Sequence, residues 1–151
     1  MLTIRPFRPA DAETVWELHN VALRDAGAHA GNGPWDEDLK QIPEAYADGV
    51  FLVGKEDGRI VAMGGIQRLS PNEAEVKRMR VHPEFQRRGF GRRILERLES
   101  EAARLGVRTL KLHTTTLQVP AQKLYEKHGY RETGRSEMLG FKTINYEKEI
   151  G

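Results

Sequence analysis

The chain has 151 residues, of which 38% are hydrophobic and 30% are charged, and its formal net charge at pH 7 is +2. This length suits one domain with a substantial core, and the apolar share is too high for a disordered chain. The absence of cysteine excludes disulfides, thiolate zinc sites and a cysteine nucleophile. We therefore expect a single domain over residues 1–151.

The chain contains no segment of the kind that crosses or anchors to a membrane. No run approaches the roughly 18 to 20 apolar residues of a membrane span. The opening residues contain no apolar stretch like that of a secretory signal. These features predict a cytoplasmic protein without a membrane partner.

The first half of the chain predicts one clear helix and several antiparallel strands. A short strand over residues 2–7 is followed by a helix over residues 12–24. The apolar side of this helix comprises Val15, Trp16, Leu18, Val21 and Ala22. A glycine-rich loop then leads to a weaker helix from Trp35 to Tyr46. Strands at 50–53 and 60–69 flank a hairpin turn at Asp57-Gly58.

The most informative stretch runs from Val76 to Leu95. Residues 76–81 favour a strand, Pro83 ends it, and a helix follows from Gly91. The apolar face of that helix comprises Ile94, Leu95, Leu98, Ala102 and Leu105. A helix N-terminus offers free N–H groups and a partial positive charge, so the loop before it is suited to a phosphate or pyrophosphate. Glycines at 89 and 91 allow close approach, and arginines at 87, 88, 92 and 93 add positive charge.

The second half predicts another strand, a short helix and a final pair of strands. Because a whole helix precedes it, the strand at 109–116 should lie parallel to the strand at 76–81. That arrangement places the glycine loop at the carboxyl end of the parallel pair, where open α/β sheets bind ligands. A short helix spans 120–127, and strands at 130–133 and 143–148 are joined by a loop through Ser136, Met138 and Gly140.

Two nucleotide-binding motifs do not fit the glycine loop. A P-loop needs Gly-Lys-Ser or Gly-Lys-Thr, and a dinucleotide fingerprint needs a third glycine where Ile94 stands. The pattern present, Gln86-x-x-Gly89-x-Gly91, closely resembles the acetyl-CoA-binding signature of the GNAT acyltransferase superfamily. A second block, Ala121-Gln122-Lys123-Leu124-Tyr125-Glu126-Lys127-His128-Gly129-Tyr130, resembles that family's A-x-x-L-Y-E-K-x-G-F/Y segment. The resemblance extends loosely over nearly the whole chain.

The resemblance implies a fold and an activity. The fold is mixed α/β (α+β), a GNAT-like three-layer sandwich in which helices flank a mostly antiparallel sheet with one central parallel strand pair. The activity is N-acetyl transfer from acetyl-CoA to a primary amine, by direct transfer in a ternary complex and without a metal. The acceptor would be a small-molecule or peptide amine, and the enzyme could form a homodimer.

The resemblance also assigns cofactor-binding residues. The pyrophosphate would be held by backbone N–H groups and side chains of Gln86, Arg87, Arg88, Gly89, Phe90, Gly91 and Arg92. Main-chain groups of Met79 and Val81 would pair with the pantetheine arm like an added strand. Gln118 stands where the family commonly has asparagine, so its amide could reach the pantetheine with a changed geometry.

Two residues are catalytic candidates. An alkyl ammonium has a pKa near about 10.4, so a base or a water path must remove its proton at neutral pH. Glu75 is the first candidate for this base, and the alternative is an exposed partner for Lys77. The lesser candidates are Glu73, Asp36 and His113. Tyr125 occupies the tyrosine of the family motif, where its hydroxyl would stabilise or protonate the departing thiolate; the alternative is an aromatic residue of the core.

Charge is distributed unevenly along the chain. Residues 68–93 contain eight basic and three acidic side chains, whereas Asp36, Glu37, Asp38, Glu44 and Asp48 form an acidic cluster. One interpretation is a basic site for an anionic cofactor and an acidic site for a cationic acceptor; the other is two solvated faces. Two other functions stay open: a non-catalytic acyl-CoA-binding sensor, and a nucleic-acid-binding module. The second is disfavoured by the low net charge and by the lack of interleaved aromatic residues.

Overall fold

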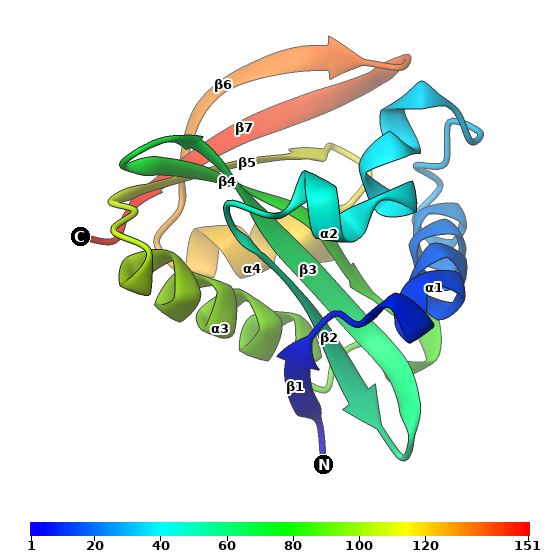
Figure 1. Ribbon diagram of the computed structural model, residues 1–151. Helices are drawn as coiled ribbons and strands as arrows, with labels where there is room; N and C mark the ends of the chain where they lie inside the picture. Colours follow the sequence, from blue (N-terminus) through cyan, green and yellow to red (C-terminus); the bar gives the residue numbers. More distant parts are fainter.

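The computed structural model describes residues 1–151 and contains one seven-stranded sheet (Figure 1). Its strand order is β1-β2-β3-β4-β5-β7-β6. The strands are β1 (Thr3–Pro6), β2 (Val50–Glu56), β3 (Arg59–Ser70), β4 (Glu73–Val81), β5 (Thr109–Thr115), β6 (Arg131–Met138) and β7 (Phe141–Glu149). All neighbours are antiparallel except β4 and β5, which are parallel. The predicted fold class and the central parallel pair are confirmed.

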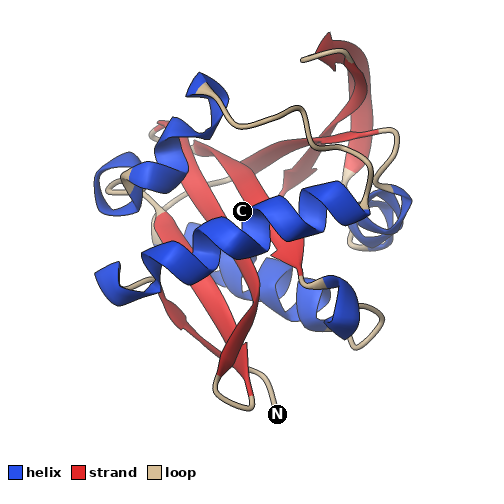
Figure 2. Cartoon of the chain, turned by 90° about the vertical axis from the view of Figure 1, so that its right-hand side faces the viewer, coloured by secondary structure: helices blue, strands red, loops and turns tan.

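Helices cover both faces of this sheet (Figures 1 and 2). They are α1 (Ala12–Asp25), α2 (Ile42–Ala45), α3 (Phe90–Arg104) and α4 (Val119–Lys127). Short 3-10 segments lie at η1 (Pro9–Asp11), η2 (Pro34–Lys40) and η3 (Pro83–Phe85). The larger hydrophobic cluster lies under α3 and α4, and a smaller one lies between α1, η2, α2 and the other face of the sheet. The three-layer arrangement therefore follows from one sheet with two apolar faces.

The buried faces of the helices refine two predictions. On α3, Ile94, Leu95, Leu98 and Ala102 are completely buried, but Leu105 lies just past the end of the helix and is 39% exposed. On α1, Val15, Leu18 and Ala22 are buried, but Val21 is 39% exposed and His19 is completely buried instead. Positions 15, 18, 19 and 22 share one helical face by their spacing, and position 21 lies off it. The prediction for Val21 is wrong because this residue is hydrophobic but lies off the buried face of the helix.

The weaker helix predicted from Trp35 to Tyr46 is two shorter elements. The 3-10 segment η2 ends at Lys40, and α2 begins at Ile42 with Pro43 in its first turn. Proline has no N–H to donate and fixes its own φ, so a helix tolerates it at its start but not in its interior.

The last two strands are longer than predicted. Met138 and Ser136 belong to β6, and only Leu139 and Gly140 form the turn, with φ of 53° and 82°. Nearly every residue of β6 is exposed, so the strand has no apolar alternation that the sequence could reveal. In Figure 1 the β6–β7 hairpin forms one edge of the sheet, where β7 pairs with β5.

A β-bulge distorts β4 in its second half. The pairing of β3 with β4 steps from Gly65–Lys77 to Met63–Arg80, so two residues of β4, Arg78 and Met79, lie opposite Gly64 alone. Arg78 has a φ of 60°, in the left-handed region. On its other edge, β4 pairs with β5 only from Glu73 to Glu75. The parallel pair therefore opens after three residues, and residues 76–81 have no strand on that side.

The packing of α3 can be tested within the helix itself. Leu98→Ala should lower the free energy of unfolding by about 2–5 kcal/mol, because a completely buried leucine leaves a cavity. Leu105→Ala is the control, since this leucine is 39% exposed, and it should cost less than about 1 kcal/mol. Urea unfolding of both variants measures the difference, and equal costs would contradict this placement of α3.

Candidate active site

A pocket lies where β4 and β5 diverge. Its walls come from α1, the loop before η2, the second half of β4, the end of β5, the start of α4 and the β6–β7 hairpin. Among the predicted residues, Glu75, Met79, Gln118 and Tyr125 line it. The predicted base, the predicted thiolate partner and the open edge of β4 therefore share one cavity, although more than 40 residues separate Glu75 from Gln118.

Tyr125 differs from the other three tyrosines of the chain. The hydroxyls of Tyr46, Tyr130 and Tyr146 each donate to a carboxylate, of Asp38, Glu99 and Glu126 respectively. The hydroxyl of Tyr125 has no such partner, and the residue is only 5% exposed while lining the pocket. Burial raises the pKa of Tyr125 to about 12, against the opposing effect of Arg80, so the hydroxyl keeps its proton at neutral pH. It is an unused donor in the pocket.

Glu75 lies beside His113 at the opening between β4 and β5. Oε2 of Glu75 is 3.4 Å from Nδ1 of His113, and both side chains line the pocket. The side chain of His113 is 39% exposed. Partial desolvation lowers its pKa, and Lys77, Arg78 and Arg80 lower it further, although Glu75 opposes them. A neutral imidazole with one nitrogen directed to a carboxylate can accept a proton at its other nitrogen. The structure brings two of the four base candidates together as a pair.

The other two base candidates are occupied elsewhere. Glu73 lies outside the pocket lining and forms an ion pair with Lys111 at 3.2 Å. Asp36 lines the pocket, but its carboxylate contacts His19 Nε2 at 3.0 Å and accepts from Asn32 and the Gly33 N–H. Neither carboxylate is free to take a proton from an amine.

The acidic side chains expected to bind a cationic acceptor, Asp36, Glu37 and Asp38, do not lie together on one exposed surface. Asp36 is only 2% exposed, and Asp38 accepts two hydrogen bonds from Arg78, at 3.0 and 2.7 Å, and one from Tyr46. Glu37 alone of the three is exposed. The buried charges are compensated inside the fold, so Asp36 and Asp38 do not present an acidic patch to a ligand.

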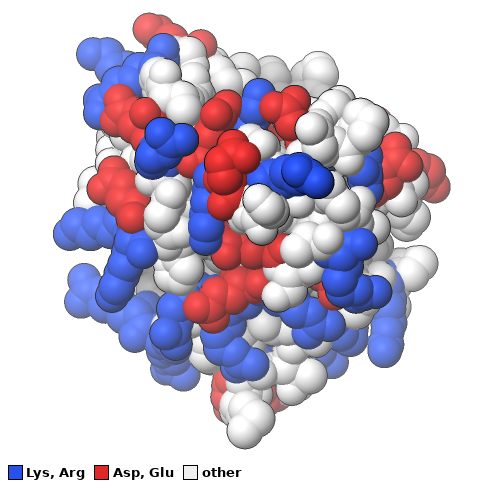
Figure 3. Space-filling model, turned by 90° about the vertical axis from the view of Figure 1, so that its left-hand side faces the viewer, with Lys and Arg blue, Asp and Glu red and all other residues white.

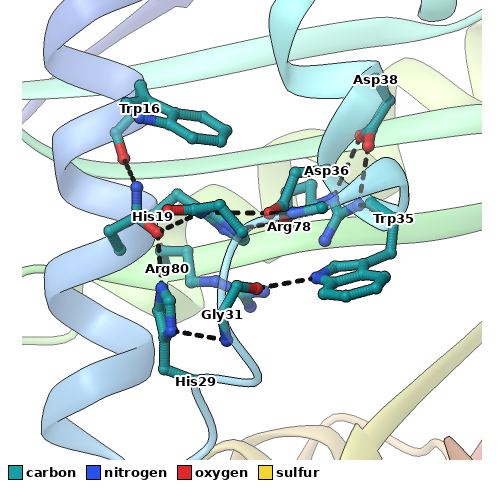
Figure 4. A network of polar contacts seen from close by, with 12 residues as sticks. Trp16, His19, His29, Gly31, Trp35, Asp36, Asp38, Arg78 and Arg80 are labelled. Carbon is teal, nitrogen blue, oxygen red and sulfur yellow. Dashed lines mark hydrogen bonds and ion pairs between the residues drawn. The ribbon is translucent and has the colours of Figure 1, made fainter. Parts of the chain in front are cut away.

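A polar network that the sequence did not reveal lies on the α1 side of the pocket (Figure 4). His19 contacts Asp36, and burial followed by Arg80 and Arg78 lowers the pKa of His19 to about 4, so it is neutral at pH 7. His29 contacts Asn20, and the indole of Trp35 donates to the carbonyl of Gly31. A histidine on the buried face of an amphipathic helix was the one signal of this network in the sequence.

The glycine loop lies at the start of α3, as predicted. Gly89 has a φ of 77° and caps the helix, whose first residue is Phe90. Arg87 also has a positive φ, of 65°, and Gln86, Arg87, Arg88 and Arg92 are exposed. An anion would find exposed arginines and the free N–H groups of a 15-residue helix at this point.

The side chains of two residues in this region, Phe90 and Arg93, are turned away from the expected pyrophosphate site. The ring of Phe90 is buried and stacks on Phe85, so only its backbone N–H faces a ligand. Arg93 donates to the carbonyl of Leu2 at 3.0 Å and is directed to β1.

Of the residues predicted to contact the pantetheine arm, Met79 and Val81 lie on β4 and Gln118 lies next to the end of β5. Met79 and Val81 lie on the open half of β4 and pack their side chains toward α3. The carbonyl of Met79 already accepts from Arg80 at 2.9 Å. Gln118 Oε1 accepts from the Thr115 N–H and two threonine hydroxyls, so it caps the end of β5 and leaves its NH₂ group for a ligand.

The structure contains no cluster of three or more histidine, cysteine or acidic side chains that could hold a metal ion. None of its helices has the length and apolar character needed to cross a membrane.

A model of the acetyltransferase (GNAT) family matches residues 6–130. The chain belongs to this family. The ribosomal protein bS18-alanine N-acetyltransferase of Salmonella typhimurium is 33% identical over 134 residues, which cover 87% of this chain and 82% of that protein. An IAA acetyltransferase of Azospirillum brasilense is 39% identical over 98 residues, 64% of this chain and 63% of the relative's length.

Solved GNAT structures share the fold over the whole chain. A GNAT acetyltransferase of Staphylococcus aureus Mu50 superposes with a TM-score of 0.91 at 19% identity, covering 100% of both chains. The acetyltransferase yncA of Salmonella typhimurium, solved with acetyl-CoA, gives 0.83 at 21% identity and covers 100% of this chain and 95% of that one. The family match and the named relatives support acetyl-CoA-dependent N-acetyl transfer for this GNAT chain.

The stability of this GNAT domain should depend on pH through His19. The pKa of His19 falls from 6.5 to about 4 on folding, so between these values the unfolded chain binds a proton that the native state does not. The free energy of unfolding should therefore fall as the pH is lowered from 6.5 to 4, and His113 acts in the same direction. His19→Asn should flatten this dependence. Urea titrations across this range measure it, and an unchanged slope in the variant would contradict the assignment.

The cradle at the start of α3 can be tested at Gly91. A Cβ here would lie 3.4 Å from Leu124 Cδ2, so a side chain can be added without a large shift. Gly91→Glu should abolish CoA binding because it places a negative charge where the pyrophosphate meets the helix N-terminus. Gly91→Ala adds bulk without charge and should weaken binding less. CoA titration with circular dichroism tests both, and unchanged affinity in folded Gly91→Glu would show that the cradle lies elsewhere.

Proposed function

We propose that this chain transfers an acetyl group from acetyl-CoA directly to a primary amine in a ternary complex, with Glu75, His113 and Tyr125 as its reacting groups. The observation that carries the proposal is the shared pocket: Tyr125, whose hydroxyl has no hydrogen-bond partner, lines the same cavity as a carboxylate–imidazole pair. The cavity opens on the unpaired edge of β4.

The cofactor is proposed to bind along that edge. Its pyrophosphate would lie at Gln86, Arg87, Arg88, Gly89, Gly91 and Arg92, with the backbone N–H of Phe90. The pantetheine arm would run beside the backbone of Met79 and Val81 and receive the amide of Gln118. This direction brings the thioester to the pocket wall that contains Tyr125.

Transfer begins with the loss of a proton from the acceptor ammonium. We propose that the Glu75–His113 pair accepts this proton, because His113 is neutral at physiological pH and Glu75 stabilises its protonated form. The free amine nitrogen then attacks the thioester carbonyl. A C–N bond forms, the C–S bond breaks, and the nitrogen loses its second proton to become an amide. That proton ends on the departing CoA sulfur, either directly or by replacing a proton that Tyr125 has donated.

Tyr125 is proposed to act on the departing sulfur. Its hydroxyl keeps its proton at neutral pH and can donate a hydrogen bond, or the proton itself, as negative charge develops on sulfur. The amide product and CoA leave, and the base returns its proton to solvent.

The alternative function of a non-catalytic acyl-CoA sensor predicts cofactor binding without turnover. Two features disfavour it, since the paired Glu75 and His113 and the unpaired Tyr125 hydroxyl would have no purpose in a pure binding site. The face of the molecule in Figure 3 has acidic and basic side chains interspersed rather than one basic surface. Ion pairs such as Lys148–Glu99 and Lys111–Glu73 also compensate basic side chains. This favours an enzyme over a nucleic-acid-binding module.

We also propose the extent of the catalytic domain, its location in the cell and the class of its acceptor. Residues 1–151 act as one catalytic domain, because a single sheet includes strands from both ends of the chain. The enzyme works in the cytoplasm on a small-molecule or peptide amine. Light scattering would determine whether the enzyme is a monomer or a homodimer.

Glu75→Gln should lower the rate at neutral pH, with recovery as the pH rises and free amine becomes abundant. Glu73→Gln is the matched control, since Glu73 lies on the same strand outside the pocket lining. Steady-state rates across pH test this pair. A loss in Glu75→Gln that does not vary with pH would assign Glu75 a structural role.

Tyr125→Phe should preserve CoA binding and the fold but lower kcat by roughly 10²- to 10⁴-fold, the range for positioned proton transfer. The acetyl-CoA KM should change little, because the hydroxyl acts mainly in the transition state. Tyr146→Phe is the control, since Tyr146 packs on Tyr125 but directs its hydroxyl to Glu126. Full kcat in Tyr125→Phe, with chemistry limiting, would leave Tyr125 as a packing residue.

A further inference from the structure

Arg80 is a cation in the acceptor pocket that has no carboxylate partner. It lines the pocket, its Nε is buried without a hydrogen-bond partner, and its one hydrogen bond goes from Nη1 to the carbonyl of Met79. An unpaired buried donor on a charged group is costly, so such a group in a pocket indicates a missing partner. Burial lowers the pKa of Arg80 to about 10, which still leaves it charged at neutral pH.

The carboxylates near Arg80 are already bound to other groups. Asp36 is bound to His19, Asn32 and the Gly33 N–H, and Asp38 is bound to Arg78 and Tyr46. Glu75 lies against His113. Lys77 also lines the pocket and makes no ion pair. Arg80 and Lys77 therefore have no carboxylate in direct contact, because the two carboxylates that line the pocket, Asp36 and Glu75, are each held by a histidine.

Arg80 is not placed to bind the phosphates of CoA. Met79 and Val81, on either side of it, pack toward α3, where the glycine loop begins. Arg80 alternates with them and lies among His19, Asp36 and Arg78 on the opposite face of the sheet (Figure 4). Its partner must come from the acceptor side of the pocket.

The mouth of the same pocket is apolar. Trp35, Met138 and Leu139 are 42%, 47% and 50% exposed, and Phe141 lies beside them on the lining. The indole of Trp35 is held in place by its bond to Gly31. This surface suits an apolar part of the acceptor that stays near the entrance.

We propose that the acceptor is a free amine that carries an acidic group, which binds Arg80, together with an apolar side chain, as in an apolar amino acid. The inference rests on the proposed acetyl transfer and narrows its substrate. Binding of the acidic group to Arg80 would favour a free amino acid over a peptide N-terminus, because the adjacent carboxyl group of a peptide is an uncharged amide. The acid would be a carboxylate or a phosphonate, since both form charge-assisted bonds with a guanidinium.

The test compares acids with their amides as acceptors of the intact enzyme. Leucine, methionine and phenylalanine, their amides and the matching 1-aminophosphonates are each assayed with acetyl-CoA. The acids should exceed the amides in kcat/KM by roughly 10- to 100-fold, the effect of one charge-assisted hydrogen bond. The aminophosphonates show which acid group the site prefers.

Arg80→Gln should bring the ratio of acid to amide toward one by lowering kcat/KM for the acid more than for the amide, and Arg80→Lys should restore part of the ratio. If the wild-type enzyme acetylates the amides with the same kcat/KM as the acids, the inference is overturned, whether or not the variants fold. Equal losses for both classes in folded Arg80→Gln would overturn it too and assign Arg80 to the thioester. If the enzyme binds acetyl-CoA but acetylates no amine, the proposed function itself fails, which is a separate result.

Discussion

The bulge at Arg78 is the constraint on which the site depends. A non-glycine residue in the left-handed region costs roughly 1–2 kcal/mol, so neighbouring contacts must hold Arg78 there. They are two hydrogen bonds to Asp38 and a third, at 2.6 Å, to the carbonyl of Trp35. These bonds tie η2 to the strand and thereby fix the wall of the pocket. They also account for the pairing of Asp38 with Arg78 at this point of the fold.

The bulge also determines toward which face of the sheet the side chains of residues 79–81 point. The extra residue lets Met79 and Val81 pack toward α3, while Arg80 lies on the acceptor face with Glu75 and Lys77. In the same region β4 separates from β5, so its edge can pair with an extended ligand. The bulge thus lies on the stretch of β4 that has left β5, and it determines which of its side chains line the pocket.

The sequence predicted the parts of this arrangement that have local signals. The glycine loop, the helix after it and Tyr125 were identifiable because short motifs and helical spacing carry them. The roles of Asp36 and Asp38 were not, because pairing with His19 and Arg78 is a tertiary contact that charge along the chain cannot show. Likewise, β6 has both faces exposed, so no alternation marked its length. The pairing of Glu75 with His113 required the register of two strands that a helix separates.

Hydrogen exchange of the backbone amides tests most directly whether acetyl-CoA binds along the open edge of β4. On addition of CoA, amides of residues 76–81 and of the loop at 87–92 should gain protection, while those of the β1–β2 edge, on the far side of the sheet, should not change. Protection that leaves residues 76–81 unaffected would contradict the account, because the divergence of β4 from β5 would then have no part in binding the cofactor.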